Sequence, residues 1–413
     1  MKRIMNILGN SEEIDKVQKR NLWALFFIGI IYGFASKPFF LVYQPFLLEI
    51  TGSILITGII VTLGGIVMFL PKPWVGRLSD KFNRKKIWLL EAPLFFIGMI
   101  LIFLADNVMF LLIGTIFFHL SAVFGGISYN MFISLSGDKA KKGILFGLMF
   151  FSIFIGNIGG EIFVLLGIIK DIRVYFLIYM IFDACNYLII NFVITNPKSE
   201  QNKDFIIKTE NSDKRQSMWR EIFKSPKKRA ILIFFLLDAF IYSISSSIIS
   251  AGLRDQYGLT YEQLAFIAIW LSITTMIFQI PGGHLADKIG KKRSLILSES
   301  FGLASYFCYI LAFIVWSLGF QFYLIPLLSI ANILNGLTAS MFIPSAQMIL
   351  TDLDETRKAE SYGISDFLIG LGFIPTGIIG GYLTEEINYI FPFILSFIGI
   401  IFLIWYLRKY FDE

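Results

Sequence analysis

Long apolar runs alternate with short polar segments along the whole chain. Twelve of these runs have the length of a membrane-spanning helix, which needs about 20 predominantly apolar residues. The predicted spans are residues 21–45, 54–75, 87–105, 108–136, 143–169, 174–195, 230–252, 261–282, 294–316, 321–350, 361–382 and 388–407. A run of this length can satisfy all its backbone polar groups within one helix, so the pattern predicts an all-α membrane protein with twelve transmembrane helices.

The composition agrees with this pattern. Of 413 residues, 56% are hydrophobic and 16% are charged, and the mean hydropathy is +0.71. Soluble domains carry about 25% charged residues, so a soluble enzyme, a disordered chain and a disulfide-stapled secreted domain are excluded. Cys185 and Cys308 lie far apart in apolar stretches, which indicates no redox or metal role. The polar first twenty residues lead directly into a long span, so no targeting segment is indicated.

The distribution of basic residues predicts the orientation in the membrane. Thirty-one of the 36 Lys and Arg residues fall in the tails and alternate loops on one side, and three fall in the loops of the other side. Basic residues concentrate in cytoplasmic loops, so both termini are predicted to be cytoplasmic in a multi-pass plasma-membrane protein. The net charge of +6 is thereby explained without nucleic acid as a partner.

A repeat divides the chain into two halves. The polar segment 196–229 predicts a cytoplasmic linker between an N-terminal six-helix half (1–195) and a C-terminal six-helix half (230–413). The loop at 76–86, after the second span, returns 207 residues later as the loop at 283–293. The matched positions include Gly76, Asp80, Arg84 and Lys85 in the first copy, and Gly283, Asp287, Lys291 and Lys292 in the second. Two parallel six-helix repeats follow.

The residue types of this loop predict a conformational gate. Glycine lets the end of one helix approach another closely, and Asp can pair with a helix N-terminus or with the basic run. We expect the contact of Asp80 to be stronger than that of Asp287. The alternative is that both loops only anchor the chain on the positive side of the membrane.

The doubled loop resembles the signature of the major facilitator superfamily of secondary transporters, G-x-L-x-D-x-x-G-R/K-K/R. The second copy is complete, and Asn83 stands where the first usually has glycine. The resemblance implies the major facilitator fold, alternating access, and a central cavity lined by spans one, four, seven and ten. It also implies a contact of Asp80 near Ser361, at the start of span eleven. We expect the chain to function as a monomer.

A second resemblance concerns the fifth span. The drug-antiporter branch of the superfamily carries G-x8-G-x3-G-P there, followed by a further glycine pair. Gly147, Gly156 and Gly160 have this spacing, but Glu161 takes the place of the proline and the downstream pair is absent. The resemblance favours efflux, whereas glycines at helical spacing are also typical of packing alone.

Ionisable groups deep in a span are costly, so each is a candidate functional residue. We predict substrate or proton binding by Lys37, His119, Glu161 and Asp238. Pro38 predicts a break in the first helix next to Lys37, and we expect Lys37 and Asp238 to face one central cavity. Asp183 is predicted to be a structural partner of a neighbouring helix. Glu91 and Glu299 lie close to the inner ends of their spans, near the basic loops, and are predicted to form ion pairs there, and Asp366 also lies near the inner end of span eleven.

These observations predict a secondary active transporter that moves a small solute by alternating access, coupled to protons, in the direction of efflux of amphipathic compounds. The alternative is proton-coupled uptake of a small anionic metabolite, with Lys37 as the counter-charge. The chain contains no nucleotide-binding loop, and its two His and two Cys are not spaced as metal ligands, so neither an enzyme nor a cofactor is expected. The expected partners are the solute, protons and the lipid bilayer.

Overall fold

The computed structural model describes residues 16–81, 83–136, 142–196, 224–351 and 358–411. This part of the chain forms helices and no strands. Twelve helical segments in it are long and apolar enough to cross a membrane, which confirms the predicted number of spans. The first six are built from α2 (Lys16–Thr51), α3 (Ile54–Phe69), α4 (Lys72–Lys81), α5 (Arg84–Leu89), α6 (Glu91–Phe103), α7 (Val108–Ser136), α8 (Lys142–Leu165) and α9 (Arg173–Phe192). The last six are built from α12 (Pro226–Ser246), α13 (Ile249–Tyr257), α14 (Tyr261–Ile289), α15 (Lys291–Ser317), η4 (Gln321–Tyr323), α16 (Leu324–Thr351), α17 (Lys358–Phe373), α18 (Thr376–Tyr382), the π-helical turn η5 (Leu383–Ile387) and α19 (Phe391–Tyr410).

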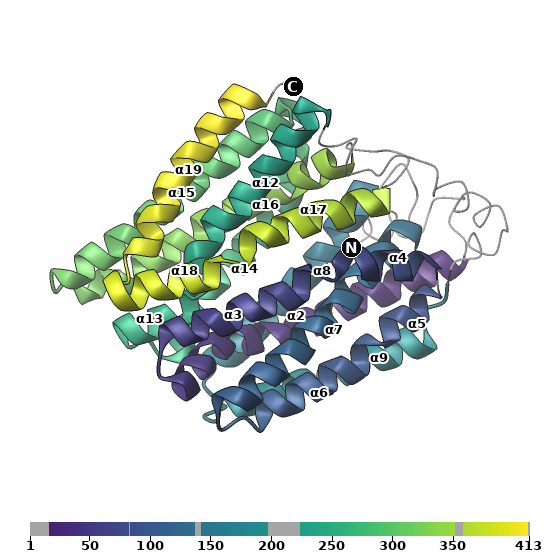
Figure 1. Ribbon diagram of the computed structural model, residues 1–413, viewed down its shortest axis with the longest axis horizontal. Coiled ribbons are helices and arrows are strands. Elements are labelled where there is room, and N and C mark those ends of the chain that lie inside the picture. Colours follow the sequence, from purple (N-terminus) through teal and green to yellow (C-terminus); the bar gives the residue numbers. More distant parts are fainter. Residues whose placement is uncertain (1–15, 82, 137–141, 197–223, 352–357, 412–413) are drawn as a thin grey trace.

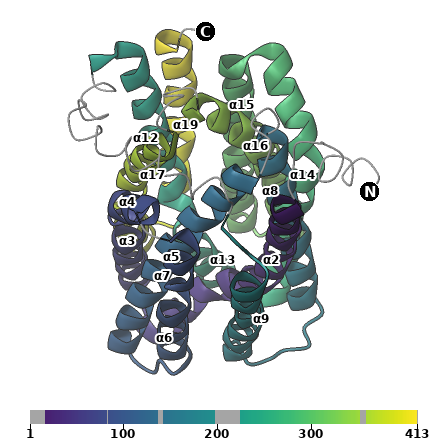
Figure 2. The same ribbon diagram turned by 90° about the vertical axis from the view of Figure 1, so that its right-hand side faces the viewer.

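The helices lie side by side in two groups, the first six spans in purple and blue and the last six in green and yellow (Figure 1). Figure 2 shows the same two groups one above the other. The groups meet through α3 against α18 and through α8 against α14. The described chain begins (α2) and ends (α19) at the same end of the bundle, while α13 lies at the opposite end (Figure 1).

Glycines bring α2 and α8 into backbone contact. A Cβ atom on Gly156 would overlap the carbonyl oxygen of Ile30, and one on Gly33 would overlap that of Ile153. Small residues at such crossings are the usual way for membrane helices to approach closely, because lipid provides no hydrophobic drive between them. Gly156 and Gly160 of the fifth span therefore serve packing and fix the distance between these two helices, whereas a Cβ on Gly147 would meet no described atom within 4 Å.

The predicted break at Pro38 is wrong. α2 runs without interruption from Lys16 to Thr51, with Pro38 and Pro45 inside it. Proline leaves the carbonyl of Phe34 without its helical partner, and this oxygen faces the glycine surface of α8, where a Cβ on Gly160 would lie 2.6 Å from it. A neighbouring helix can support a proline-containing span in this way, so the helix continues.

The seventh span is interrupted instead. α12 ends at Ser246 and α13 begins at Ile249, so backbone groups between them lose their helical partners. Gln44 of α2 satisfies two such groups: its Nε2 donates to the carbonyl of Ser247 at 2.9 Å, and the backbone N–H of Ser250 donates to its Oε1 at 3.0 Å. A side chain of the first helix group therefore completes a broken helix of the second.

Candidate functional site

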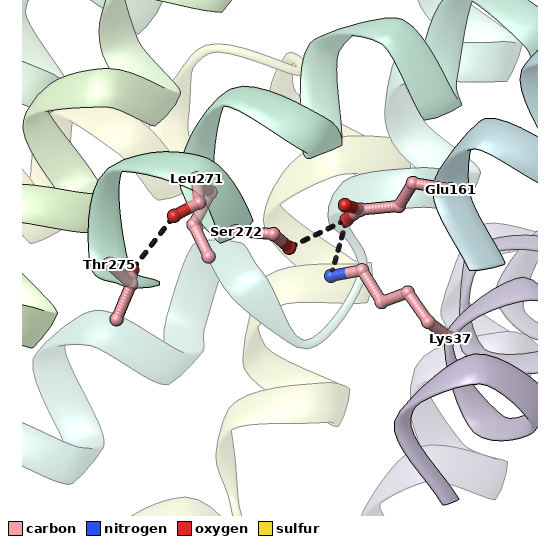
Figure 3. Close-up of polar contacts among 5 residues, drawn as sticks. All are labelled: Lys37, Glu161, Leu271, Ser272 and Thr275. Atoms are coloured by element: carbon pink, nitrogen blue, oxygen red, sulfur yellow. Dashed lines mark hydrogen bonds and ion pairs between the residues drawn. The ribbon is translucent and has the colours of Figure 1, made fainter. Parts of the chain in front are cut away.

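An ion pair lies deep in the bundle, where both helix groups meet. Lys37 Nζ of α2 is 3.1 Å from Glu161 Oε1 of α8, and the hydroxyl of Ser272 on α14 donates to the same oxygen at 2.9 Å (Figure 3). The Glu161 side chain is 1% exposed and the Lys37 side chain is 25% exposed. α2 and α8 belong to the first six spans and α14 belongs to the last six. The three side chains therefore connect the two halves at membrane depth.

The local sequence explains how this pair forms. Glu161 directly follows Gly160, one of the glycines that let α8 approach α2. Lys37 directly precedes Pro38, whose ring carbons lie 2.8 and 3.2 Å from the position that a Cβ on Gly160 would occupy. The close contact between the two helices thus places the ammonium and the carboxylate opposite each other.

The ion pair retains unused hydrogen-bonding capacity. Glu161 Oε2 is buried and has no hydrogen-bond partner in the described part of the chain. An ammonium group has three donors, and the Lys37 side chain is 25% exposed. A solute carboxylate could therefore bind Lys37, and a proton could bind Glu161, with each event weakening the ion pair between them.

A second buried cluster connects α12 with α15. The hydroxyl of Tyr242 donates to Glu299 Oε2 at 3.0 Å, and Gly302 leaves the room that this hydroxyl occupies. Asp238 lies close enough to the fully buried Glu299 for their charges to interact, and Asp238 Oδ1 and Glu299 Oε1 are both buried without a hydrogen-bond partner in the described part of the chain. No described Lys or Arg forms an ion pair with either acid. Two neighbouring buried carboxyl groups without a cation cannot easily both be ionised, so this cluster is a second candidate proton site.

The four predicted site residues thus fall into separate places. Lys37 and Glu161 are brought together, while Asp238 lies in the cluster with Glu299. His119 of α7 packs its ring against Gly64 of α3. Within the described residues, no hydrogen bond or ion pair joins Lys37 to Asp238, and their shared cavity stays a prediction.

Glu299 and Glu91 differ from the expectation of ion pairs with basic groups. Tyr242 is the hydrogen-bond donor to Glu299, and Trp88 Nε1 donates to Glu91 Oε2 at 3.0 Å. The prediction failed because both carboxylates turn into the helix packing instead of toward the loops. The repeat could have indicated that the two acids have equivalent positions in the fold, since Glu91 and Glu299 follow the two matched basic runs at almost the same distance. Asp183 accepts a hydrogen bond from Asn186 of its own helix, at 3.0 Å.

The predicted gate is described only in part. The side chains of Asp80, of Asp287 and of Ser361 and its neighbours lie outside what the structure describes. No described atom lies within 4 Å of a Cβ built on Gly76, so a close helix approach at Gly76 is not observed. Lys85 Nζ donates to the carbonyl of Asn191, near the end of α9, at 2.6 Å. This contact attaches the first loop to the sixth span.

Polar contacts join the halves near both ends of the bundle. At the end that holds the termini, Lys72 Nζ is 2.9 Å from Asp366 Oδ2, and this ion pair connects spans two and eleven. At the opposite end, Glu49 accepts from Arg254 at 3.1 Å and from the hydroxyl of Tyr261 at 2.9 Å. Contacts of this kind must exchange if the halves move relative to each other.

The fold and the site together define a class of protein: a polytopic helical membrane protein in which polar contacts at membrane depth link two six-helix groups, as expected of a solute transporter. A family model described as the Major Facilitator Superfamily matches residues 25–313 and 231–413. The chain belongs to this superfamily and is a multi-pass membrane protein with the major facilitator fold.

The individual proteins that the chain resembles share less than 30% of their residues with it. The chain is 29% identical over 137 residues to the quinolone resistance protein NorA of Staphylococcus aureus, which covers 33% of this chain and 32% of NorA. It therefore spans about a third of the length of the curated relatives that it matches first. It is 22% identical over 244 residues to the class B tetracycline resistance protein of Escherichia coli, covering 58% and 59% of the two chains. The crystal structure of the nucleoside transporter NupG shares the fold with a TM-score of 0.72 at 14% identity, covering 95% of this chain and all of NupG.

Proposed function

We propose that this chain is a proton-coupled secondary transporter that exports amphipathic small molecules by alternating access. The observation that carries the proposal is the contact of Lys37 and Glu161 with Ser272 across the two helix groups. Protonation of Glu161 would remove its charge and weaken both its attraction to Lys37 and the hydrogen bond that it accepts from Ser272, which is the contact between the halves at this point. The names of two relatives, a quinolone and a tetracycline resistance protein, support export as the direction.

Proton coupling is proposed to use both buried clusters. The Asp238–Glu299 pair lies in the second half and the Lys37–Glu161 pair lies mainly in the first, so protonation can act on each side of the interface. One proton moving down 100 mV supplies about 2.3 kcal/mol, which supports a solute gradient of roughly fifty-fold. Electrochemical driving of this size is sufficient for export without nucleotide hydrolysis.

The direct test uses the purified protein in liposomes that contain a pH-sensitive dye. Under an imposed pH gradient, a quinolone or tetracycline should move in the direction opposite to the protons, and Glu161→Gln should abolish that coupling. Transport of these probes at the same rate with and without the gradient would overturn proton coupling. Absence of any movement of either probe would overturn this substrate class.

The second candidate is proton-coupled uptake of a small anionic metabolite. It is favoured by the partly exposed ammonium of Lys37, which can act as a counter-charge for a bound carboxylate or phosphate. The same liposomes distinguish the two candidates, because uptake requires an anionic probe and protons to move in the same direction. A nucleoside should be included among the probes, since the structural relative NupG is a nucleoside transporter.

The proposed orientation places both termini in the cytoplasm. Single cysteines at Ser212 and Asp255, in a background without Cys185 and Cys308, test it. Asp255 is exposed and lies in the short segment between the predicted spans seven and eight. Thr260 lies in the same segment but is less suitable for a cysteine, because its hydroxyl caps the N-terminus of α14. An impermeant maleimide should label position 255 but not position 212 from outside intact cells, and the reverse would invert the topology.

A further inference from the structure

A groove lies between the first turns of α12 and the last turns of α19, at the end of the bundle that holds the termini. It encloses about 860 Å³, and its lining includes Lys227, Arg229, Ile233, Phe402, Trp405 and Tyr410. The hydroxyl of Tyr406 donates to the carbonyl of Ala230 at 3.2 Å and so ties the two helices together beside the groove. The volume is in the range of pockets that bind small molecules.

The chemistry of the groove changes along its length. Ile233 is 39% exposed and Phe402 is 43% exposed, so the deeper part offers apolar surface to the lipid tails. Lys227 and Arg229 stand near the start of α12, toward the water. Aromatic residues of the kind that occupy the headgroup level of a bilayer, Trp405 and Tyr410, complete the lining. An apolar part next to a basic and aromatic part matches one amphipathic molecule, a phospholipid.

The charges of the groove select the type of lipid. Lys227 and Arg229 contribute two cations, and none of the described residues that line the groove is acidic. Lys409 Nζ adds a third cation beside it, 4.8 Å from the centre of the Trp405 ring and 5.2 Å from that of Tyr410. The ammonium of a zwitterionic headgroup would meet these cations unfavourably, whereas a headgroup with a net negative charge would not.

We propose that this groove binds an anionic phospholipid, with its phosphate at Lys227 and Arg229 and one acyl chain over Ile233 and Phe402. The groove is separate from the Lys37–Glu161 site, because all its lining residues belong to α12, its N-cap and α19. A free anion would not use the apolar part, so the occupant is a membrane lipid. Each cation near an anionic membrane surface strengthens binding about fivefold, so removing both should weaken it roughly thirtyfold.

Quenching of Trp405 fluorescence by brominated lipids tests the proposal. The full-length protein is reconstituted into phosphatidylcholine vesicles with a minor fraction of brominated phosphatidylglycerol, or of brominated phosphatidylcholine. The Trp405 signal is taken as the difference between the parent protein and Trp405→Phe. It should be quenched preferentially by the anionic lipid, and the preference should be lost in the double variant Lys227→Ala/Arg229→Ala.

Two further variants keep the result interpretable. Lys16→Ala/Lys19→Ala removes the same charge from exposed positions at the same end of the bundle, and it should retain the preference. Lys227→Arg/Arg229→Lys preserves both charges and should also retain it, which separates charge loss from damage to α12. An equal loss in the Lys16→Ala/Lys19→Ala variant would assign the effect to general surface charge and overturn the site. Displacement of the lipid by inorganic phosphate would overturn the lipid in favour of a free anion.

Discussion

Removal of Lys37 is the sharpest perturbation of the site between the halves. Lys37→Met leaves the carboxylate of Glu161 without its cation, and that carboxylate is 1% exposed. Breaking a buried ion pair by removing one partner costs about 3–5 kcal/mol, since the remaining charge stays buried and uncompensated. Ser272 still donates to Glu161, but one neutral hydroxyl cannot replace an ammonium. We therefore expect the free energy of unfolding to fall by about 3–5 kcal/mol.

The double variant Lys37→Met/Glu161→Gln should recover most of this loss. It removes both charges, and neutral replacements of a buried ion pair are often tolerated or stabilising. Ser272 can then donate to the amide oxygen introduced at position 161. Unfolding of the purified proteins in detergent, followed by tryptophan fluorescence against denaturant, measures the free energy of unfolding of the parent, of Lys37→Met and of the double variant.

The matched control is Lys72→Met, which breaks a more exposed ion pair, the one that joins spans two and eleven. Its partner Asp366 has a side chain that is 42% exposed, so the loss should be about 1 kcal/mol or less. Equal losses for Lys37→Met and Lys72→Met would refute the argument from burial. A double variant as unstable as Lys37→Met alone would refute the argument from charge.

Three other predictions follow from the packing and the contacts between the halves. Gly156→Leu should destabilise the protein by about 1–3 kcal/mol in the same assay, because its Cβ overlaps a backbone carbonyl, whereas Gly147→Ala has open space and should be neutral. Arg254→Gln should shift the equilibrium between the conformations of the two halves by about fivefold or less, because the exposed ion pair with Glu49 contributes at most about 1 kcal/mol. Distances between spin labels on the two halves, placed at the end that holds Glu49 and Arg254, measure this shift. Asp80→Asn should slow transport and change the distances between labels on spans two and eleven; unchanged distances with normal turnover would reduce the loop to an anchor.

Much of the fold could be predicted from the sequence because membrane spans follow from short-range composition. An apolar run of sufficient length must be helical in lipid, whatever lies beside it. The repeat and the family could also be recognised from a short local motif, the doubled loop with Gly76 and Gly283 at equivalent positions. The prediction failed where a neighbouring helix decides whether a helix continues. At Pro38 the glycine face of α8 supports the helix, and α2 continues past the proline.

The site was predicted only in part because it depends on contacts between distant segments. The cost of a charge in lipid was enough to select Lys37, Glu161 and Asp238 individually. Their partners depend on which helices pack together, and no local pattern states that α2 meets α8 or that α12 reaches Glu299. Position along the span misled the interpretation of Glu299, since depth alone does not say which way a side chain turns.

The crossing of α3 with α18 has a mechanical consequence. At this crossing a Cβ on Gly58 would overlap the carbonyl oxygen of Gly377, and one on Gly377 would overlap that of Gly58. The two backbones therefore touch directly at these glycines, and one small side chain completes the contact, since Thr62 Oγ1 accepts a hydrogen bond from the Ile378 N–H at 3.0 Å. If the halves rock in the proposed transport cycle, no large side chain has to repack at this crossing, so it can serve as a pivot while the polar contacts at either end of the bundle are exchanged.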